Sequence, residues 1–126
     1  MSTREIARDH WKSFCDGFSQ QHRGWLVTIM VTAADREEQM VIAHDLRLSG
    51  VIYDDAEDSL LYLVGRTPES HVTHTVDHPR RLWVEQQDEG LVSALDVEDA
   101  GGRITELRFR TTLPADMLNG VLSGAP

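Results

Sequence analysis

The spacing of apolar residues changes once along this chain, at Gly24, and this change constrains the fold more than any other feature. Before Gly24 the apolar side chains recur at i, i+3, i+4 and i+7, and polar residues fill the opposite face. After it, from residue 25 to residue 33, side chains alternate between two faces. The first spacing is typical of an amphipathic helix and the second of a β-strand.

The helical segment is expected over residues 9–22, and its ends carry the usual signals. Asp9 lies near the start and His22 near the end, which suits the helix dipole, and Gly24 can adopt the left-handed conformation that ends a helix. Its apolar stripe is predicted to pack into the core; the stripe consists of Trp11, Phe14, Cys15 and Phe18.

The pleated pattern continues to residue 110 in short segments separated by turn-length links that carry Gly, Pro or acidic residues. Gly50 interrupts one such segment, which indicates a bulge or a bend. Pro114 begins a stretch, residues 114–122, that favours a short closing helix. The predicted fold class is therefore α+β. It comprises an N-terminal amphipathic helix packed on a strongly bent antiparallel meander of about six to seven strands, barrel-like or a half-open roll, with a short C-terminal helix.

Length and composition narrow the class of protein. The 126 residues suit a single domain, with residues 1–5 and 123–126 expected to fray. Cys15 is the one cysteine, so no disulfide is expected within the chain, and neither a signal peptide nor a spanning helix is predicted; a cytoplasmic location follows as an expectation. The 21 acidic and 12 basic residues give a formal charge of −9, which disfavours nucleic acid and membrane as partners.

Four segments stand out in the sequence: Ile6-x-x-Asp9-x-Trp11-x-x-Phe14-x-x-x-Phe18, Gly24-Trp25-Leu26-Val27-Thr28, His71-Val72-Thr73-His74-Thr75-Val76 and Leu107-Arg108-Phe109-Arg110. Together they resemble a family of small prokaryotic domains of unknown function. The resemblance spans nearly the whole chain and implies a complete standalone unit, but it implies no activity, cofactor or catalytic residue.

A second, weaker resemblance is to the Sm-like RNA-binding fold, which also opens with a helix followed by a bent antiparallel sheet. Residues 48–52, the acidic pair Asp54-Asp55 and the apolar residues 60–63 are similar to its first motif. Its second motif needs a basic residue directly followed by a glycine, and no such pair follows Val76. This resemblance implies a ring that binds RNA, which the negative charge opposes.

Histidines are the first candidates for chemistry, because neutral imidazole is a common metal ligand. His71 and His74 are three residues apart on a predicted strand, so they point to opposite faces. His74 and His78 share a face, and His44 on another strand could complete a site. The alternative is that these are surface and turn residues, so no cofactor is predicted and the metal candidates are His44, His74 and His78.

Arginines form the one basic concentration, and they offer a candidate ligand site. The candidates are Arg81, Trp83, Arg108 and Arg110. Left unpaired they would bind an anion or a carboxylate, whereas pairing across strands with Glu85, Asp96 or Glu98 would neutralise them. Acidic clusters such as residues 54–58 are interpreted as solvated turns, and Cys15 as a core residue rather than a nucleophile.

Three functions remain open from the sequence. The favoured hypothesis is a non-catalytic binding or assembly module with a protein partner or a second copy of itself, because both faces of several strands are apolar, as with Leu61 and Leu63 opposite Leu60 and Tyr62. The second is a small-ligand or metal-binding protein, or an enzyme, that uses the concave face of the sheet. The third is the Sm-like ring. Whether the chain is an enzyme stays open, leaning to no.

Overall fold

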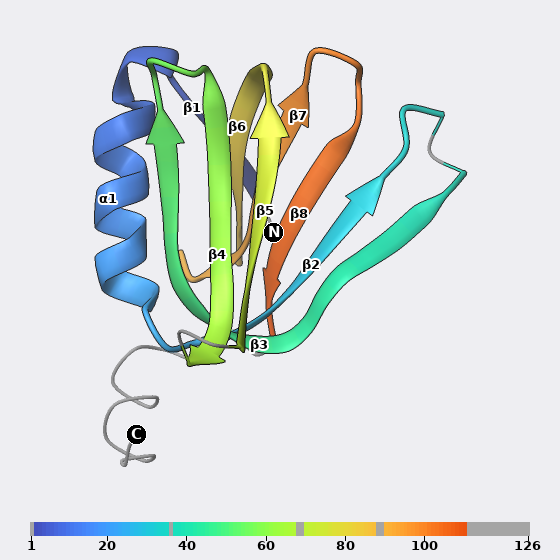
Figure 1. The fold of residues 1–126 in the computed structure, drawn as a ribbon. Helices are drawn as coiled ribbons and strands as arrows, with labels where there is room; N and C mark the ends of the chain where they lie inside the picture. Colours follow the sequence, from blue (N-terminus) through green and yellow to red (C-terminus); the bar gives the residue numbers. More distant parts are fainter. Residues whose placement is uncertain (1, 36, 68–69, 88–89, 111–126) are drawn as a thin grey trace.

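A computed structural model describes the chain except for residues 1, 36, 68–69, 88–89 and 111–126, and it consists of one helix and eight strands in the part described (Figure 1). A turn of 3-10 helix (Arg8–His10) leads into the helix α1 (Trp11–His22). The strands are β1 (Ser2–Ile6), β2 (Leu26–Thr32), β3 (Gln39–Asp54), β4 (Ser59–Thr67), β5 (Ser70–Asp77), β6 (Pro79–Gln86), β7 (Val92–Asp99) and β8 (Ile104–Phe109).

All eight strands belong to one antiparallel sheet in the order β1-β6-β7-β8-β2-β3-β4-β5. The long strand β3 changes partner along its length: residues 39–47 pair with β2, and residues 48–54 pair with β4. The register is irregular between Leu48 and Gly50, where the partner changes. As Figure 1 shows, β4 and β5 therefore form a second layer in front of β6, β7 and β8.

Helix α1 lies beside the half of β3 that has left β2, and Ser19 joins the two. The Ser19 hydroxyl oxygen accepts a hydrogen bond from the Val51 N–H at 2.7 Å. It lies 2.9 Å from the Val51 carbonyl oxygen and 2.8 Å from that of Cys15, either of which it can donate to. Gly50 lies next to this contact, and a Cβ there would be at an ordinary van der Waals distance, 3.5 Å, from Ser19 Oγ. The helix thus takes the place of a strand at this edge of β3.

The core lies between the two layers and beneath the helix. Trp11, Cys15 and Phe18 of α1 are buried in it, and Phe14 is partly buried against it. Tyr62 of β4 crosses from one layer to the other and donates a hydrogen bond to the carbonyl oxygen of Leu95 on β7 at 3.2 Å. The inward side chains of the central strands are fully buried; they include Val27, Ile29, Leu60, Val64, Leu82, Val84, Leu95, Val97 and Leu107.

The N-terminal residues correct one expectation, because they form a strand instead of fraying. Residues 2–6 are strand β1, which pairs with β6 from Ser2 opposite Gln86 to Ile6 opposite Leu82. Only Ile6 of this strand is buried, so the sequence lacks the alternation by which a strand is recognised. A strand at the edge of a sheet can be held by backbone hydrogen bonds to its neighbour, so it needs few apolar side chains. Within the described ranges the sheet accordingly has eight strands and not six to seven.

The topology also differs from a simple meander. Strands β5 and β6 follow each other in the chain but are not neighbours, because the short link through His78 crosses from one layer to the other. His78 has a φ of 54°, a left-handed turn conformation. Strand β8 then pairs with β2, which joins β6, β7 and β8 to β2 and β3 in the first layer. The expected C-terminal helix, residues 114–122, and the frayed end, 123–126, lie outside the described residues.

Candidate functional site

Three carboxylates and one guanidinium gather on the outer face of β6, β7 and β8; we call Glu85, Asp96, Glu106 and Arg108 the carboxylate cluster. Their chain neighbours, such as Leu95 and Leu107, point into the core, so the cluster residues point away from it. Asp96 lies directly opposite Glu106, and Ala94 lies between Glu85 and Arg108 in the register. The small side chain of Ala94 leaves room for Glu85 and Arg108 to meet above it.

Arg108 holds two of these carboxylates. Its Nη2 lies 2.8 Å from Oε1 of Glu85 and 2.8 Å from Oε2 of Glu106, and its Nε donates to Oε1 of Glu106 at 3.2 Å. These contacts raise the pKa of Arg108. One carboxylate oxygen from each of Glu85, Asp96 and Glu106 lies within 4.8 Å of the other two. The cluster thus places three oxygen ligands at the spacing of a single coordination shell.

Asp96 is the unusual member of the cluster. Only 3% of its surface is exposed, and its Oδ1 has no hydrogen-bond partner in the described part of the chain. Burial, a hydrogen bond with Glu85 and the negative charges of Glu85 and Glu106 raise the pKa of Asp96 to about 9, against the opposing charge of Arg108. The pKa of Glu85 is lowered, first by its hydrogen bond with Asp96 and also by Arg108. The surroundings of Asp96 therefore favour its protonated form, whereas those of Glu85 favour its ionised form.

A second feature is the edge of strand β5 around Thr73 and Thr75, on the side away from β4. The N–H and C=O of Val51 point to Ser19 and not to β4. In an antiparallel ladder, residue pairs that are hydrogen-bonded to each other alternate with pairs that are not. Followed from β3 through β4 to β5, this alternation means that the backbone N–H and C=O of His74 point toward β4. The N–H and C=O of Thr73 and Thr75 therefore point away from β4. Among the described residues no strand pairs with that edge.

Two inward side chains of β5 are incompletely covered by the rest of the described fold. Val72 and His74 face inward like Val64 and Tyr62 on the next strand, yet they stay half-exposed while Val64 and Tyr62 are fully buried. On the opposite face of this layer Ile52 is 47% exposed. Strand β5 therefore presents both polar backbone groups and incompletely covered apolar surface.

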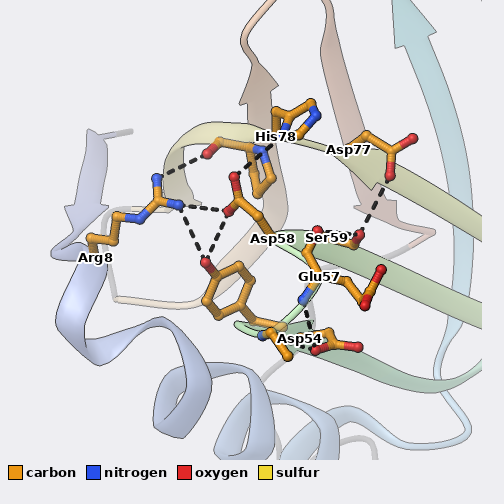
Figure 2. Close-up of polar contacts among 10 residues, drawn as sticks. Arg8, Asp54, Glu57, Asp58, Ser59, Asp77 and His78 are labelled. Carbon is orange, nitrogen blue, oxygen red and sulfur yellow. Dashed lines mark hydrogen bonds and ion pairs between the residues drawn. The ribbon is translucent and has the colours of Figure 1, made fainter.

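A third group of polar residues ties three connections together; we call Arg8, Tyr53, Asp58 and His78 the turn clasp (Figure 2). Arg8 donates to Oδ1 of Asp58 at 2.6 Å and to the Pro79 carbonyl oxygen at 3.0 Å. The Tyr53 hydroxyl donates to Oδ1 of Asp58 at 3.0 Å, and Nδ1 of His78 lies 3.4 Å from Oδ2. These contacts join the start of the helix to the β3–β4 and β5–β6 links, which is a structural task.

The structure places the three candidate histidines in different surroundings. His44 is exposed on β3, 3.6 Å from Asp45; His74 faces inward from β5, where burial and the charge of Arg103 lower its pKa; and His78 belongs to the turn clasp. Among the described residues, the three side chains that lie together within metal-ligating reach are those of Glu85, Asp96 and Glu106, and none of them is a histidine. The structure does not bring His44, His74 and His78 together.

Two of the candidate arginines, Arg81 and Arg108, form ion pairs with carboxylates on other strands. Arg81 lies 3.2 Å from Glu5 and 3.7 Å from Glu98, with its guanidinium 5.4 Å from the ring centre of Trp83. Arg108 belongs to the carboxylate cluster, and Arg110 is exposed next to the end of β8. Cys15 is fully buried, and burial together with the charge of Asp16 raises the pKa of its thiol to about 12. Such a thiol is not a nucleophile at neutral pH.

The carboxylate cluster itself was not predicted as a site. The sequence suggested Glu85 and Asp96 as partners for arginines, and it gave no role to Glu106. These residues lie on three strands, and each of them follows or precedes an apolar residue that faces the core. This alternation of apolar and charged residues indicates that they face outward, but it does not indicate that they meet. Only the strand register shows that they meet.

Comparison with known proteins places the whole described fold in one family. The model of a family described as "Family of unknown function (DUF5335)" matches residues 2–117. A curated protein of Aquifex aeolicus (strain VF5), named only as an uncharacterized protein, is 25% identical over 114 residues, which cover 90% of this chain and 97% of that protein.

No solved structure matches the chain. The resemblance to the Sm-like fold therefore gains no support from these comparisons. Within the described residues, no helix has the length and the apolar character needed to cross a bilayer.

Proposed function

Because the chain belongs to this family of unknown function, its role has to be argued from its own residues, and we propose that it is a non-catalytic assembly module of the cytoplasm that pairs with a second copy of itself through strand β5. The observation that carries the proposal is the edge of β5 around Thr73 and Thr75, with which no strand of the described residues pairs. An edge of this kind exposes a row of backbone donors and acceptors that another strand can complete.

The two edges of the sheet differ in a way that favours β5. Strand β1 carries Arg4 and Glu5 within five residues, and charged side chains on an edge discourage pairing with other chains. Strand β5 has no Lys, Arg, Pro or Glu, and its one acidic residue, Asp77, is at its end. Its two Thr and two Val residues have high β-propensity. Strand β5 is therefore the edge without the usual protection.

A two-fold axis at His74 would satisfy the free backbone groups on both copies. With antiparallel pairing about this axis, Thr73 would exchange hydrogen bonds with Thr75 of the partner subunit, and Thr75 with the partner's Thr73. The pairing is isologous, since each copy uses the same strand. It would also cover Val72 and His74, the two inward side chains that the monomer leaves half-exposed.

Light scattering after size-exclusion chromatography tests the proposal. We expect the wild-type protein to be a dimer at about 100 μM, and Thr75→Pro to be a monomer, because proline removes an outward N–H without disturbing the ladder to β4. Thr73→Lys is a second variant, which places a charge on the same edge. Thr75→Val is the matched control, because it keeps the N–H and the β-branched shape and should remain a dimer.

Two outcomes would contradict the proposal. One is a wild-type protein that stays monomeric as its concentration is raised. The other is a dimer that survives both Thr75→Pro and Thr73→Lys while circular dichroism shows that the variants are folded. A different protein as the natural partner of β5 would appear as the first of these outcomes.

A further inference from the structure

The charges of the carboxylate cluster do not balance. Glu85, Asp96 and Glu106 supply three negative charges when ionised, and Arg108 supplies one positive charge. Arg108 bonds to Glu85 and Glu106, while Oδ1 of Asp96 is buried without a hydrogen-bond partner in the described part of the chain. A buried carboxylate oxygen in this state lacks the partner that such groups normally have.

We propose that the carboxylate cluster is a binding site for one hard divalent cation, with Glu85, Asp96 and Glu106 as its protein ligands. The cation would displace the proton that Asp96 favours, would balance the two excess negative charges of the three ionised carboxylates, and would give the buried oxygen of Asp96 a partner. Arg108 would remain beside Glu85 and Glu106 and orient their carboxylates, as groups next to a metal site commonly do.

The ligand set selects the class of ion. Three carboxylates without nitrogen or sulfur suit Ca²⁺, Mg²⁺ or Mn²⁺, and they do not suit softer ions. Oxygens that lie within 4.8 Å of one another fit around one ion at metal–oxygen distances of about 2.0–2.6 Å. The side chains come from three adjacent strands of a continuous ladder, so the sheet holds them in place without an ion.

The site does not depend on the proposed pairing through β5. Its residues lie on the outer face of the first layer, whereas β5 is the edge of the second layer (Figure 1). Failure of one proposal therefore leaves the other unaffected.

Thermal unfolding of the full chain, first treated with EDTA and then titrated with CaCl₂, MgCl₂ or MnCl₂ at constant ionic strength, tests the inference. We expect a saturable rise in Tm with at least one of these ions at or below about 10 mM, and calorimetric titration should show one ion per chain. Asp96→Asn should weaken the Kd at least about tenfold, because the neutral amide replaces a charged ligand. Glu106→Gln is the second variant and should weaken binding in the same direction.

Glu98→Gln is the matched control. Glu98 lies on the same strand and the same face as Asp96, but it pairs with Arg81 outside the cluster. Its Kd should stay within about twofold of the wild-type value. The inference is overturned if none of the three ions gives a saturable shift, if Asp96→Asn and Glu106→Gln retain the wild-type shift, or if Glu98→Gln loses it equally.

Discussion

Asp96 and His22 are ionisable side chains in surroundings that disfavour their charge. Asp96 is buried on the outer face of the sheet among other carboxylates. His22 ends helix α1 inside an aromatic group, with ring centres 4.4 Å from Phe18, 4.8 Å from Phe109 and 4.6 Å from Trp25. Its Nδ1 lies 2.9 Å from the Phe18 carbonyl oxygen, and burial lowers its pKa. Both residues should make stability depend on pH, over different ranges.

Asp96→Asn should stabilise the metal-free protein at neutral and alkaline pH. The folded pKa of Asp96, about 9, lies above its ordinary value of 3.8, so the folded state binds the proton more tightly. The contribution of Asp96 to the free energy of unfolding therefore falls as pH rises from about 4 to about 9, by at most about 1.4 kcal/mol per pH unit. The Asn variant cannot titrate and does not show this fall. Urea unfolding in EDTA at several pH values measures the difference. Equal slopes for variant and wild type would refute it.

His22→Phe should remove a loss of stability at acidic pH. The folded pKa of His22 is below 6.5, so the unfolded chain binds the proton more readily and wild-type stability falls as pH drops below about 6.5. Phenylalanine keeps the aromatic contacts and cannot titrate. Unfolding at pH 7.5 and pH 5 compares the two proteins, and His10→Phe, which replaces an exposed histidine, serves as the control. An unchanged pH dependence in His22→Phe would contradict this origin.

At the scale of elements, α1 and β3 depend on one hydroxyl. Ser19 satisfies the backbone groups of Val51 that have no strand partner, and Trp11 packs edge-on against Tyr53 further along the same strand, with ring centres 5.2 Å apart. The helix therefore needs a short polar side chain at position 19 as well as its apolar stripe. Hydrophobic spacing gives no indication of such a requirement.

Ser19→Ala should destabilise the fold by about 1–3 kcal/mol, because it leaves the buried N–H and C=O of Val51 without a partner. Chemical denaturation measures the change in the free energy of unfolding. Ser13→Ala, on the exposed face of the same helix, removes one local hydrogen bond to the His10 carbonyl oxygen and should cost much less. Equal effects of the two substitutions would show that the contact with Val51 contributes little.

The elements that the sequence predicted are those with a strong period. The stripe of Trp11, Phe14, Cys15 and Phe18 predicted the helix, and Gly50 predicted the bend in β3. Strand β1 was missed because only its last residue is apolar. The carboxylate cluster was missed as a site because Glu85, Asp96 and Glu106 are about ten residues apart and meet only through the pairing of three strands.

At the scale of the whole molecule, the proposed pairing through β5 links stability to concentration. If two copies associate only when folded, raising the protein concentration should raise Tm for the wild type. Thr75→Pro, as a monomer, should have a Tm independent of concentration. Differential scanning calorimetry over about a hundredfold range of concentration measures both dependences. A wild-type Tm that does not change would count against association in the folded state.

The unlike edges of the sheet have a consequence for how far assembly can go. A fibre grows when each subunit offers two adhesive ends, so that every addition exposes a new one. Here the other terminal strand bears Arg4, above the ring of Phe14, and Glu5, held by Arg81. If two copies join through β5, the sheet edges that the described part of the pair still presents would be these charged strands, and growth would stop at a closed pair.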